Sequence, residues 1–134
     1  PQTVTALHRA DKDVHILSGG LRQAILPLGA MLGIPSGNIH AVDVMFHADG
    51  SYKGFDEASP LARPGGKAEI CRKLGASCCR VALVGDGATD IEAREGGAFV
   101  IGFGGIIARD AVISGADIYV PGPGLSAVLK PLLG

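Results

Sequence analysis

Two acidic residues follow a short apolar run in the segment from Val81 to Asp90. Asp86 stands where the run stops, between two glycines, and Asp90 opens the next predicted element. The run is typical of a buried parallel strand, and ligands of open α/β sheets bind outside the carboxyl ends of such strands. Carboxylate oxygens at that place suit a hard cation such as Mg²⁺. The alternative is a plain turn, because Asp-Gly is a common turn pair and Asp90 could simply cap a helix.

A hydroxyl group and two glycines follow an earlier apolar run, at Ser18, Gly19 and Gly20. Backbone N–H groups beside a helix N-terminus can hold an anion, and the serine hydroxyl adds one more hydrogen bond. The alternative is that Ser18 caps the next helix and the glycines only turn the chain. The residues by themselves leave both interpretations open.

A third polar group, Lys67, follows Gly65 and Gly66 at the expected start of a helix. Its compact charge suits phosphate oxygens, although a cation at a helix N-terminus opposes the helix dipole. An ordinary surface lysine is the alternative. The segment is not a P-loop, because Ala68 stands where Ser or Thr is required. The later Gly-Phe-Gly-Gly run also fails the dinucleotide fingerprint, because Ile107 replaces its third glycine.

The remaining reactive side chains show no spacing typical of a metal site or a catalytic nucleophile. His15 is expected within a strand and the other histidines at the surface; they are His8, His40 and His47. The cysteines are expected to be core or surface thiols; they are Cys71, Cys78 and Cys79. Their odd number and the absence of a C-x-x-C pair argue against a zinc site or a disulfide framework, and favour a reducing compartment.

The composition describes one folded domain. The chain has 134 residues, 47% of them hydrophobic and 19% charged, which is enough for a real core. A net charge of −1 gives no support to binding of nucleic acid or a membrane surface. No apolar stretch reaches transmembrane length, and no signal peptide is visible.

Periodicity places these polar groups on alternating strands and helices. Helices are expected at 3–10, 21–32, 65–74, from about 89, at 108–114 and at 125–133. Strands are expected at 14–17, 39–46, 51–55, 81–84, 99–101 and 117–120. Asp49-Gly50 predicts a hairpin turn, so a β-hairpin insertion is expected near 42–56. This alternation indicates one α/β domain over 1–134, a sandwich around a mostly parallel sheet.

In this order the segments resemble the haloacid dehalogenase superfamily of phosphohydrolases, and within it the phosphoserine phosphatase branch. The resemblance covers essentially the whole chain and runs through residues 16–20, 54–57, 65–67, 84–90 and 99–105. Gly-Asp-Gly-x-x-Asp indicates the superfamily, while Gly-Phe-Asp-Glu and Gly-Phe-Gly-Gly point to the branch. A small departure is Leu21, where the branch usually has Phe. The resemblance implies a three-layer Rossmann-like sandwich.

The resemblance also implies a role for each polar group. The residues near the substrate phosphoryl group would be Ser18, Gly19, Gly20, Lys67 and Thr89. Among them Lys67 would neutralise phosphoryl charge and help to position the nucleophile. Asp86 would bind the cofactor Mg²⁺. Asp90 would not bind the ion but would orient the groups that do.

One departure limits what this chain is expected to do alone. The family carries an Asp-x-Asp motif at the end of its first strand, with the nucleophile first and the general acid/base second. Asp11-Lys12-Asp13 has that spacing, but it precedes the expected strand 14–17 and is interpreted as a turn. The chain is therefore expected to be the C-terminal part of the core domain, without the nucleophile strand and the cap. That leaves the sheet incomplete and the chain inactive alone.

The expected reaction is hydrolysis of O-phospho-L-serine to L-serine and phosphate, the last step of serine biosynthesis, through an aspartyl-phosphate intermediate. Two alternatives stay open: a non-catalytic binding module of the same fold, and a phosphatase for another small phosphomonoester. Nucleic acid and membrane are not expected partners, and a homodimer of the full-length protein is left open. The expected location is cytoplasmic, or the plastid in a plant or alga.

Overall fold

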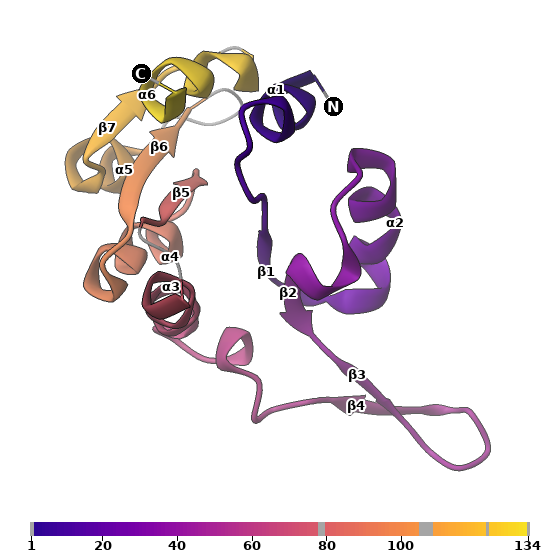
Figure 1. Cartoon of the computed structure of the whole chain (residues 1–134). Coiled ribbons are helices and arrows are strands. Elements are labelled where there is room, and N and C mark those ends of the chain that lie inside the picture. Colours follow the sequence, from indigo (N-terminus) through magenta and orange to yellow (C-terminus); the bar gives the residue numbers. More distant parts are fainter. Residues whose placement is uncertain (1, 78–79, 105–108, 123, 134) are drawn as a thin grey trace. The chain divides into compact units, whose positions relative to one another are not determined.

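The computed structural model describes residues 2–77, 80–104, 109–122 and 124–133. These residues form two compact units, Pro1–Gly66 and Lys67–Gly134, which are described in turn. Figure 1 labels their helices and strands along the chain.

The first unit is built on two parallel strands. In chain order its first elements are α1 (Gln2–Arg9), β1 (Ile16–Leu21), α2 (Arg22–Leu32), the 3-10 helix η1 (Ser36–Asn38) and β2 (Ile39–Val42). Strands β1 and β2 pair Ile16 with Ile39 and Leu17 with His40, and their register shifts before Leu21. The prediction of a parallel strand here is confirmed. However, β1 begins two residues later than expected and continues through the serine and both glycines.

Apolar side chains from α1, β1, α2 and β2 form the core of this unit. Its buried residues are Val4, Ile34, Ile39 and Ala41, and partly buried side chains from 14, 16, 25, 26 and 32 pack against them. Helix α2 continues through Pro27 and ends at Gly33, whose φ of 70° is the left-handed geometry expected of a C-terminal cap. The predicted helix and its stop are both confirmed.

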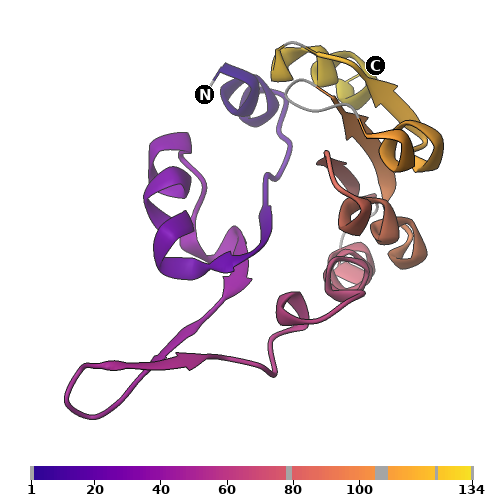
Figure 2. The ribbon, with the colours of Figure 1, turned by 180° about the vertical axis from the view of Figure 1, so that it is seen from behind.

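A β-hairpin follows β2, as the Asp49-Gly50 pair predicts. Strands β3 (Val44–Phe46) and β4 (Tyr52–Phe55) are antiparallel and form a sheet of their own (Figure 2). Asp49 Oδ1 accepts hydrogen bonds from the Ser51 N–H at 2.9 Å and the Ser51 hydroxyl at 2.6 Å. Gly50 has a φ of 89°, which favours glycine. A short 3-10 helix, η2 (Pro60–Ala62), lies in the expected loop after the hairpin.

The second unit carries a three-stranded parallel sheet. Its elements are α3 (Gly66–Ser77), β5 (Ala82–Gly85), α4 (Ala88–Ile91), η3 (Glu92–Gly96), β6 (Phe99–Phe103), α5 (Asp110–Gly115), β7 (Ile118–Val120), η4 (Leu125–Val128) and α6 (Leu129–Leu133). The strand order is β5-β6-β7, and both neighbouring pairs are parallel. These parallel pairs confirm the predicted α/β architecture.

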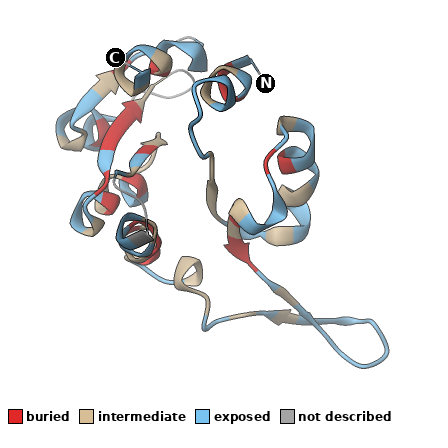
Figure 3. Cartoon of the chain, in the orientation of Figure 1, coloured by how far each residue is buried: buried red, intermediate tan, exposed pale blue. Residues whose placement is uncertain are grey.

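Burial in this unit concentrates on β6, the middle strand, as Figure 3 shows. Ile101 packs with Val120 and Val128, and the partly buried Val84 and Phe103 pack against them. The central strand must be apolar on both faces, because other parts of the chain cover both faces of the sheet there.

Several predicted boundaries change, and the strand expected at 39–46 divides into β2 and β3. The strand expected at 99–101 continues to Phe103, because β7 supplies pairing partners up to that residue. The helix expected near Thr89 is one turn long and passes into η3, and the last helix divides into η4 and α6. Residue 108, the expected start of a helix, lies outside the described residues.

Two histidine predictions are wrong. His15 lies just before β1 rather than within a strand, and His40 is half-buried in β2 rather than on the surface. His8 and His47 are exposed, as expected.

Candidate active site

Two of the polar groups predicted from the second half of the chain meet the ammonium group of a third. Lys67, in the first turn of α3, pairs through Nζ with Asp90 Oδ1 and donates a hydrogen bond to Thr89 Oγ1 at 3.3 Å. Only 18% of the Lys67 side chain and 11% of the Asp90 side chain are exposed. The pairing explains why a cation can occupy the start of a helix, because a carboxylate offsets its conflict with the dipole.

The backbone after β5 is shaped to hold Asp90 in this place. Helix α4 begins at Ala88 after the extended Gly87, and Asp90 Oδ2 accepts a hydrogen bond from the Gly87 N–H at 2.9 Å. A Cβ atom on Gly85 would come within 2.5 Å of the Asp90 Cβ atom, so only glycine fits there. The acid therefore caps its own helix and holds the lysine at the same time.

Asp86 has different surroundings, although it is only four residues away. It is exposed in the bend that follows β5, and within the described residues its carboxylate makes no hydrogen bond or ion pair. Of the two acids it is the one whose oxygens remain available for a ligand. The two interpretations of this segment thus divide between them: Asp90 caps a helix, and Asp86 is free.

A hard cation fits Asp86 as one ligand. Mg²⁺ in proteins keeps several waters and often takes only one or two carboxylates together with substrate phosphate oxygens. Asp90 is already bonded to Lys67 and to the Gly87 N–H. It would therefore position the groups around the ion without binding the ion itself. No group of three or more His, Cys, Asp or Glu side chains within the described parts of the chain is arranged to hold a metal ion.

The thiol on α3 belongs to the packing and not to the site. Cys71 is buried, and this burial raises the pKa of its thiol, while the positive charge of Lys67 opposes the shift more weakly. A buried thiol of raised pKa is a poor nucleophile. Cys71 is therefore a core thiol, and Cys78 and Cys79 lie outside the described residues.

Ser18 lies in β1 of the first unit, and it does not cap a helix. Leu21 occupies the N-cap position of α2, where no side-chain hydrogen bond is formed. The Ser18 hydroxyl oxygen instead accepts a hydrogen bond from the Gly20 N–H at 3.0 Å. The capping interpretation of Ser18 is therefore wrong. Its own hydroxyl hydrogen stays available for a further acceptor.

The predicted residues thus fall into two groups by unit. Ser18, Gly19 and Gly20 belong to the first, and the structure gathers Lys67, Thr89 and Asp90 in the second.

The sequence alone did not single out Arg22, which anchors the start of α2. Its Nε donates to Asp43 Oδ1 and its Nη1 to the Ile39 carbonyl, each at 2.6 Å. It also did not predict that Asp13, His15 and His40 contact one another near the start of β1. The available signal was proximity along the chain, which brings residues 13 and 15 together but not His40, 25 residues after His15.

None of the helices in the described segments has the length and hydropathy that a membrane span requires.

The comparisons with known proteins agree on one family of hydrolases. The family model of haloacid dehalogenase-like hydrolases matches residues 1–96. The chain is similar to chloroplastic phosphoserine phosphatase of Arabidopsis thaliana, with 42% identity over 87% of this chain and 41% of that protein. It is also similar to phosphoserine phosphatase of Drosophila melanogaster, with 39% identity over 87% of this chain and 44% of that protein.

A solved structure shows the same fold. A phosphoserine phosphohydrolase-like protein from Francisella tularensis superposes with a TM-score of 0.82 at 28% identity, over 99% of this chain and 61% of that one. The chain spans less than half the length of the two curated relatives.

Proposed function

This chain belongs to the haloacid dehalogenase-like hydrolases and has their Rossmann-like α/β fold, and on this premise we propose that it serves in a Mg²⁺-dependent phosphoserine phosphatase. The substrate would be O-phospho-L-serine, and the products L-serine and phosphate. The proposal draws on the similarity to phosphoserine phosphatases and on the chemistry of the site.

The observation that carries the proposal is the arrangement around Lys67. Asp90 and Thr89 restrain its ammonium group, so that its remaining N–H can point at a phosphoryl oxygen. Phosphoryl transfer spreads negative charge over the equatorial oxygens, and a positioned cation stabilises that charge. Lys67 would therefore act on the transition state and not only on substrate binding.

Asp86 would hold Mg²⁺ beside this lysine. When bound, the ion would supply further stabilisation of charge on the phosphoryl oxygens. Asp86 is suited to this because its carboxylate is exposed and has no partner in the described chain. Asp90 would keep the turn between the two acids in place through the Gly87 N–H.

Ser18 and the two glycines after it would bind the phosphoryl group from β1. The hydroxyl oxygen already accepts from the Gly20 N–H, so its hydrogen can be donated to a phosphoryl oxygen. Gly19 and Gly20 are exposed, which leaves room for an anion beside the backbone.

The nucleophile is not among the carboxylates described here. Asp13 Oδ1 accepts from Asn38 at 2.8 Å and Oδ2 contacts His15 at 3.0 Å, which supports its interpretation as a structural turn residue. In the proposed reaction an aspartate outside these 134 residues attacks phosphorus, and the serine oxygen leaves with a proton from a neighbouring acid. Water then cleaves the acyl phosphate, which releases phosphate and restores the carboxylate.

Complementation tests this function. The chain is purified alone, and again together with the N-terminal part of the Arabidopsis thaliana relative, and phosphate release from O-phospho-L-serine is measured with and without Mg²⁺. We expect no turnover by the chain alone and Mg²⁺-dependent turnover by the complemented protein. Lys67→Met should then lower kcat by about 10²-fold or more.

Three outcomes would change the proposal. Turnover by the chain alone would contradict its dependence on an external nucleophile. A complemented protein that prefers another small phosphomonoester would assign a different substrate. A complemented, folded protein without any phosphatase activity would favour a non-catalytic binding module.

The expectations on assembly and location remain proposals of the same kind. We propose a homodimer for the full-length protein and a cytoplasmic or plastid location. The Arabidopsis thaliana relative is chloroplastic by name.

A further inference from the structure

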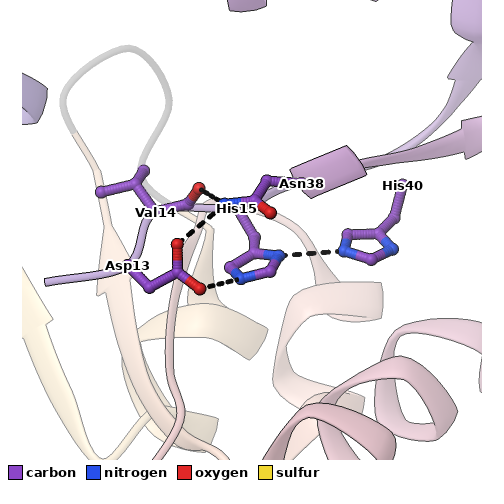
Figure 4. Close-up of polar contacts among 5 residues, drawn as sticks. All are labelled: Asp13, Val14, His15, Asn38 and His40. Carbon is purple, nitrogen blue, oxygen red and sulfur yellow. Dashed lines mark hydrogen bonds and ion pairs between the residues drawn. The ribbon is translucent and has the colours of Figure 1, made fainter. Parts of the chain in front are cut away.

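A chain of polar contacts links three side chains near the start of β1, as Figure 4 shows. His15 Nε2 lies 3.0 Å from Asp13 Oδ2, and His15 Nδ1 lies 3.0 Å from His40 Nε2. Asn38 holds the carboxylate by donating to Asp13 Oδ1 at 2.8 Å and to the Val14 carbonyl at 3.1 Å. We call Asp13, His15 and His40 the histidine cluster.

The parallel register brings the two rings together. His40 in β2 pairs with Leu17 in β1, and His15 lies two residues before Leu17 on the same face. The ring centroids are 5.3 Å apart and the ring planes are inclined by 19°, and Figure 4 shows the rings meeting edge to edge. This arrangement is that of an N–H···N hydrogen bond, with one hydrogen between two nitrogens.

The cluster has room for one added proton. The Asp13 carboxylate accepts from the His15 Nε2–H, so His15 Nδ1 accepts a hydrogen from His40 Nε2 in the neutral state. When a proton adds to the pair at His40 Nδ1, the hydrogen on His40 Nε2 passes to His15 Nδ1, so that His15 Nδ1 becomes the donor and His40 Nε2 the acceptor. The contact survives in both states.

A second proton cannot be accommodated in the same way. Both facing nitrogens would then carry hydrogen, the hydrogen bond would be lost, and two cations would lie side by side. Burial is the main reason that the pKa of His40 is lowered, and the charges of His15 and Arg22 lower it further. The hydrogen bond from His15 keeps the pKa of Asp13 low, so that its carboxylate stays charged.

The other charged groups around His40 do not take the place of its contact with His15. Arg22 on α2 is turned to Asp43 and to the Ile39 carbonyl, and it adds positive charge. His8 on α1 acts on Asp13.

We propose that the histidine cluster is an acid-sensitive contact between β1 and β2, which accepts one proton without change and opens when a second proton arrives. Folding then responds to pH with a definite sign. The pKa of His40 is below its ordinary value of 6.5 in the folded chain, so unfolding takes up a proton. Stability is complete above about pH 6.5 and falls as the pH drops through the lowered pKa of His40.

The contact lies just before the strand that carries Ser18 and joins it to β2. In the proposed function, opening of β1 from β2 would loosen the phosphoryl-binding segment, and this consequence rests on that function. The titration itself does not. A fully active complemented enzyme with independent histidines would refute the cluster alone, and a coupled titration in an inactive protein would refute only the function.

NMR titration of the whole chain tests the proposal. The imidazole signals of the wild type are followed from pH 8 to pH 4, together with the same signals in His15→Phe and His40→Phe. We expect the His40 midpoint to lie below 6.5 and to rise in His15→Phe, because the neighbouring positive charge is gone. The matched control His47→Phe, at an exposed histidine without a side-chain partner in the described chain, should leave the His40 midpoint unchanged.

Urea unfolding at several pH values, followed by NMR signals of β1 and β2, gives a second measurement. The urea concentration at the wild-type unfolding midpoint should decrease when the pH is lowered from 7.5 to 5. In His40→Phe most of this decrease should be lost. Titration of His40 at or above 6.5, or a midpoint that does not move in His15→Phe, would overturn the proposal. The wild-type titration alone decides the first point if a variant does not fold.

Discussion

Asp86 and Asp90 show how far surroundings can separate two identical side chains. One is exposed and unpartnered in the described chain, while the other is 11% exposed and bonded to an ammonium group and a backbone N–H. Removing one partner of a buried ion pair leaves an uncompensated charge, whereas changing an exposed charge costs little. The two acids should therefore respond differently to the same substitution.

We expect Asp90→Asn to lower the free energy of unfolding by about 2–4 kcal/mol, because Lys67 loses its countercharge. Asp86→Asn, the same change at the exposed position, should stay within about 0.5 kcal/mol of the wild type. Urea unfolding of both variants at pH 7.5 measures the difference. Equal effects on stability would contradict the assignment of Asp90 as the structural acid.

At the level of elements, the turn from β5 into α4 is the tightest feature of the candidate site. Gly85 ends the strand directly beside the Asp90 side chain, and helix α4 begins three residues later. The glycine is required for close approach and not for a positive φ, since its backbone is that of an ordinary strand. A methyl group added at Gly85 would test whether the space beside Asp90 is as tight as this.

We predict that Gly85→Ala lowers the free energy of unfolding by at least about 2 kcal/mol, because the new Cβ overlaps Asp90 and displaces it from Lys67. The matched control is Gly75→Ala in helix α3, where the nearest atom to an added Cβ is Val81 Cγ2 at 3.9 Å. Alanine favours the helix there, so this variant should gain about 0.5–1 kcal/mol. Thermal unfolding of the two variants compares them. A neutral Gly85→Ala would show that the turn can relax.

On the scale of the whole molecule, four parallel strands of the described segments have only one neighbour each. Strands β1 and β2 pair only with each other, and β5 and β7 each pair only with β6. Parallel sheets are normally paired and covered, and an unpaired edge offers N–H and C=O groups to other chains. The resemblance to the family implies a nucleophile strand that would serve as a neighbour.

The isolated chain should therefore associate at micromolar concentration, and the N-terminal part of a relative should return it to a defined assembly. Size-exclusion chromatography with light scattering, with and without that part, measures this. A monomeric chain with one cooperative unfolding transition would contradict the prediction.

Much of the local structure could be predicted because it depends on neighbours in the chain. Gly33 ends a helix and Asp49-Gly50 turns a hairpin wherever the flanking residues are as they are here. The apolar run before Asp86 predicted its strand for the same reason. Boundaries at β1 and β6 could not be predicted, since a strand continues for as long as its neighbour supplies pairing groups.

The sequence by itself determined the α/β class, the order of the polar groups and the Gly-Asp-Gly-x-x-Asp pattern that marks the family. Only the tertiary structure decided that Asp90 holds Lys67 while Asp86 stays free, that Ser18 does not cap α2, and that His15 meets His40. Those contacts join residues 23 and 25 positions apart. Periodicity reports which face a residue occupies, but the partner on that face depends on how distant elements pack.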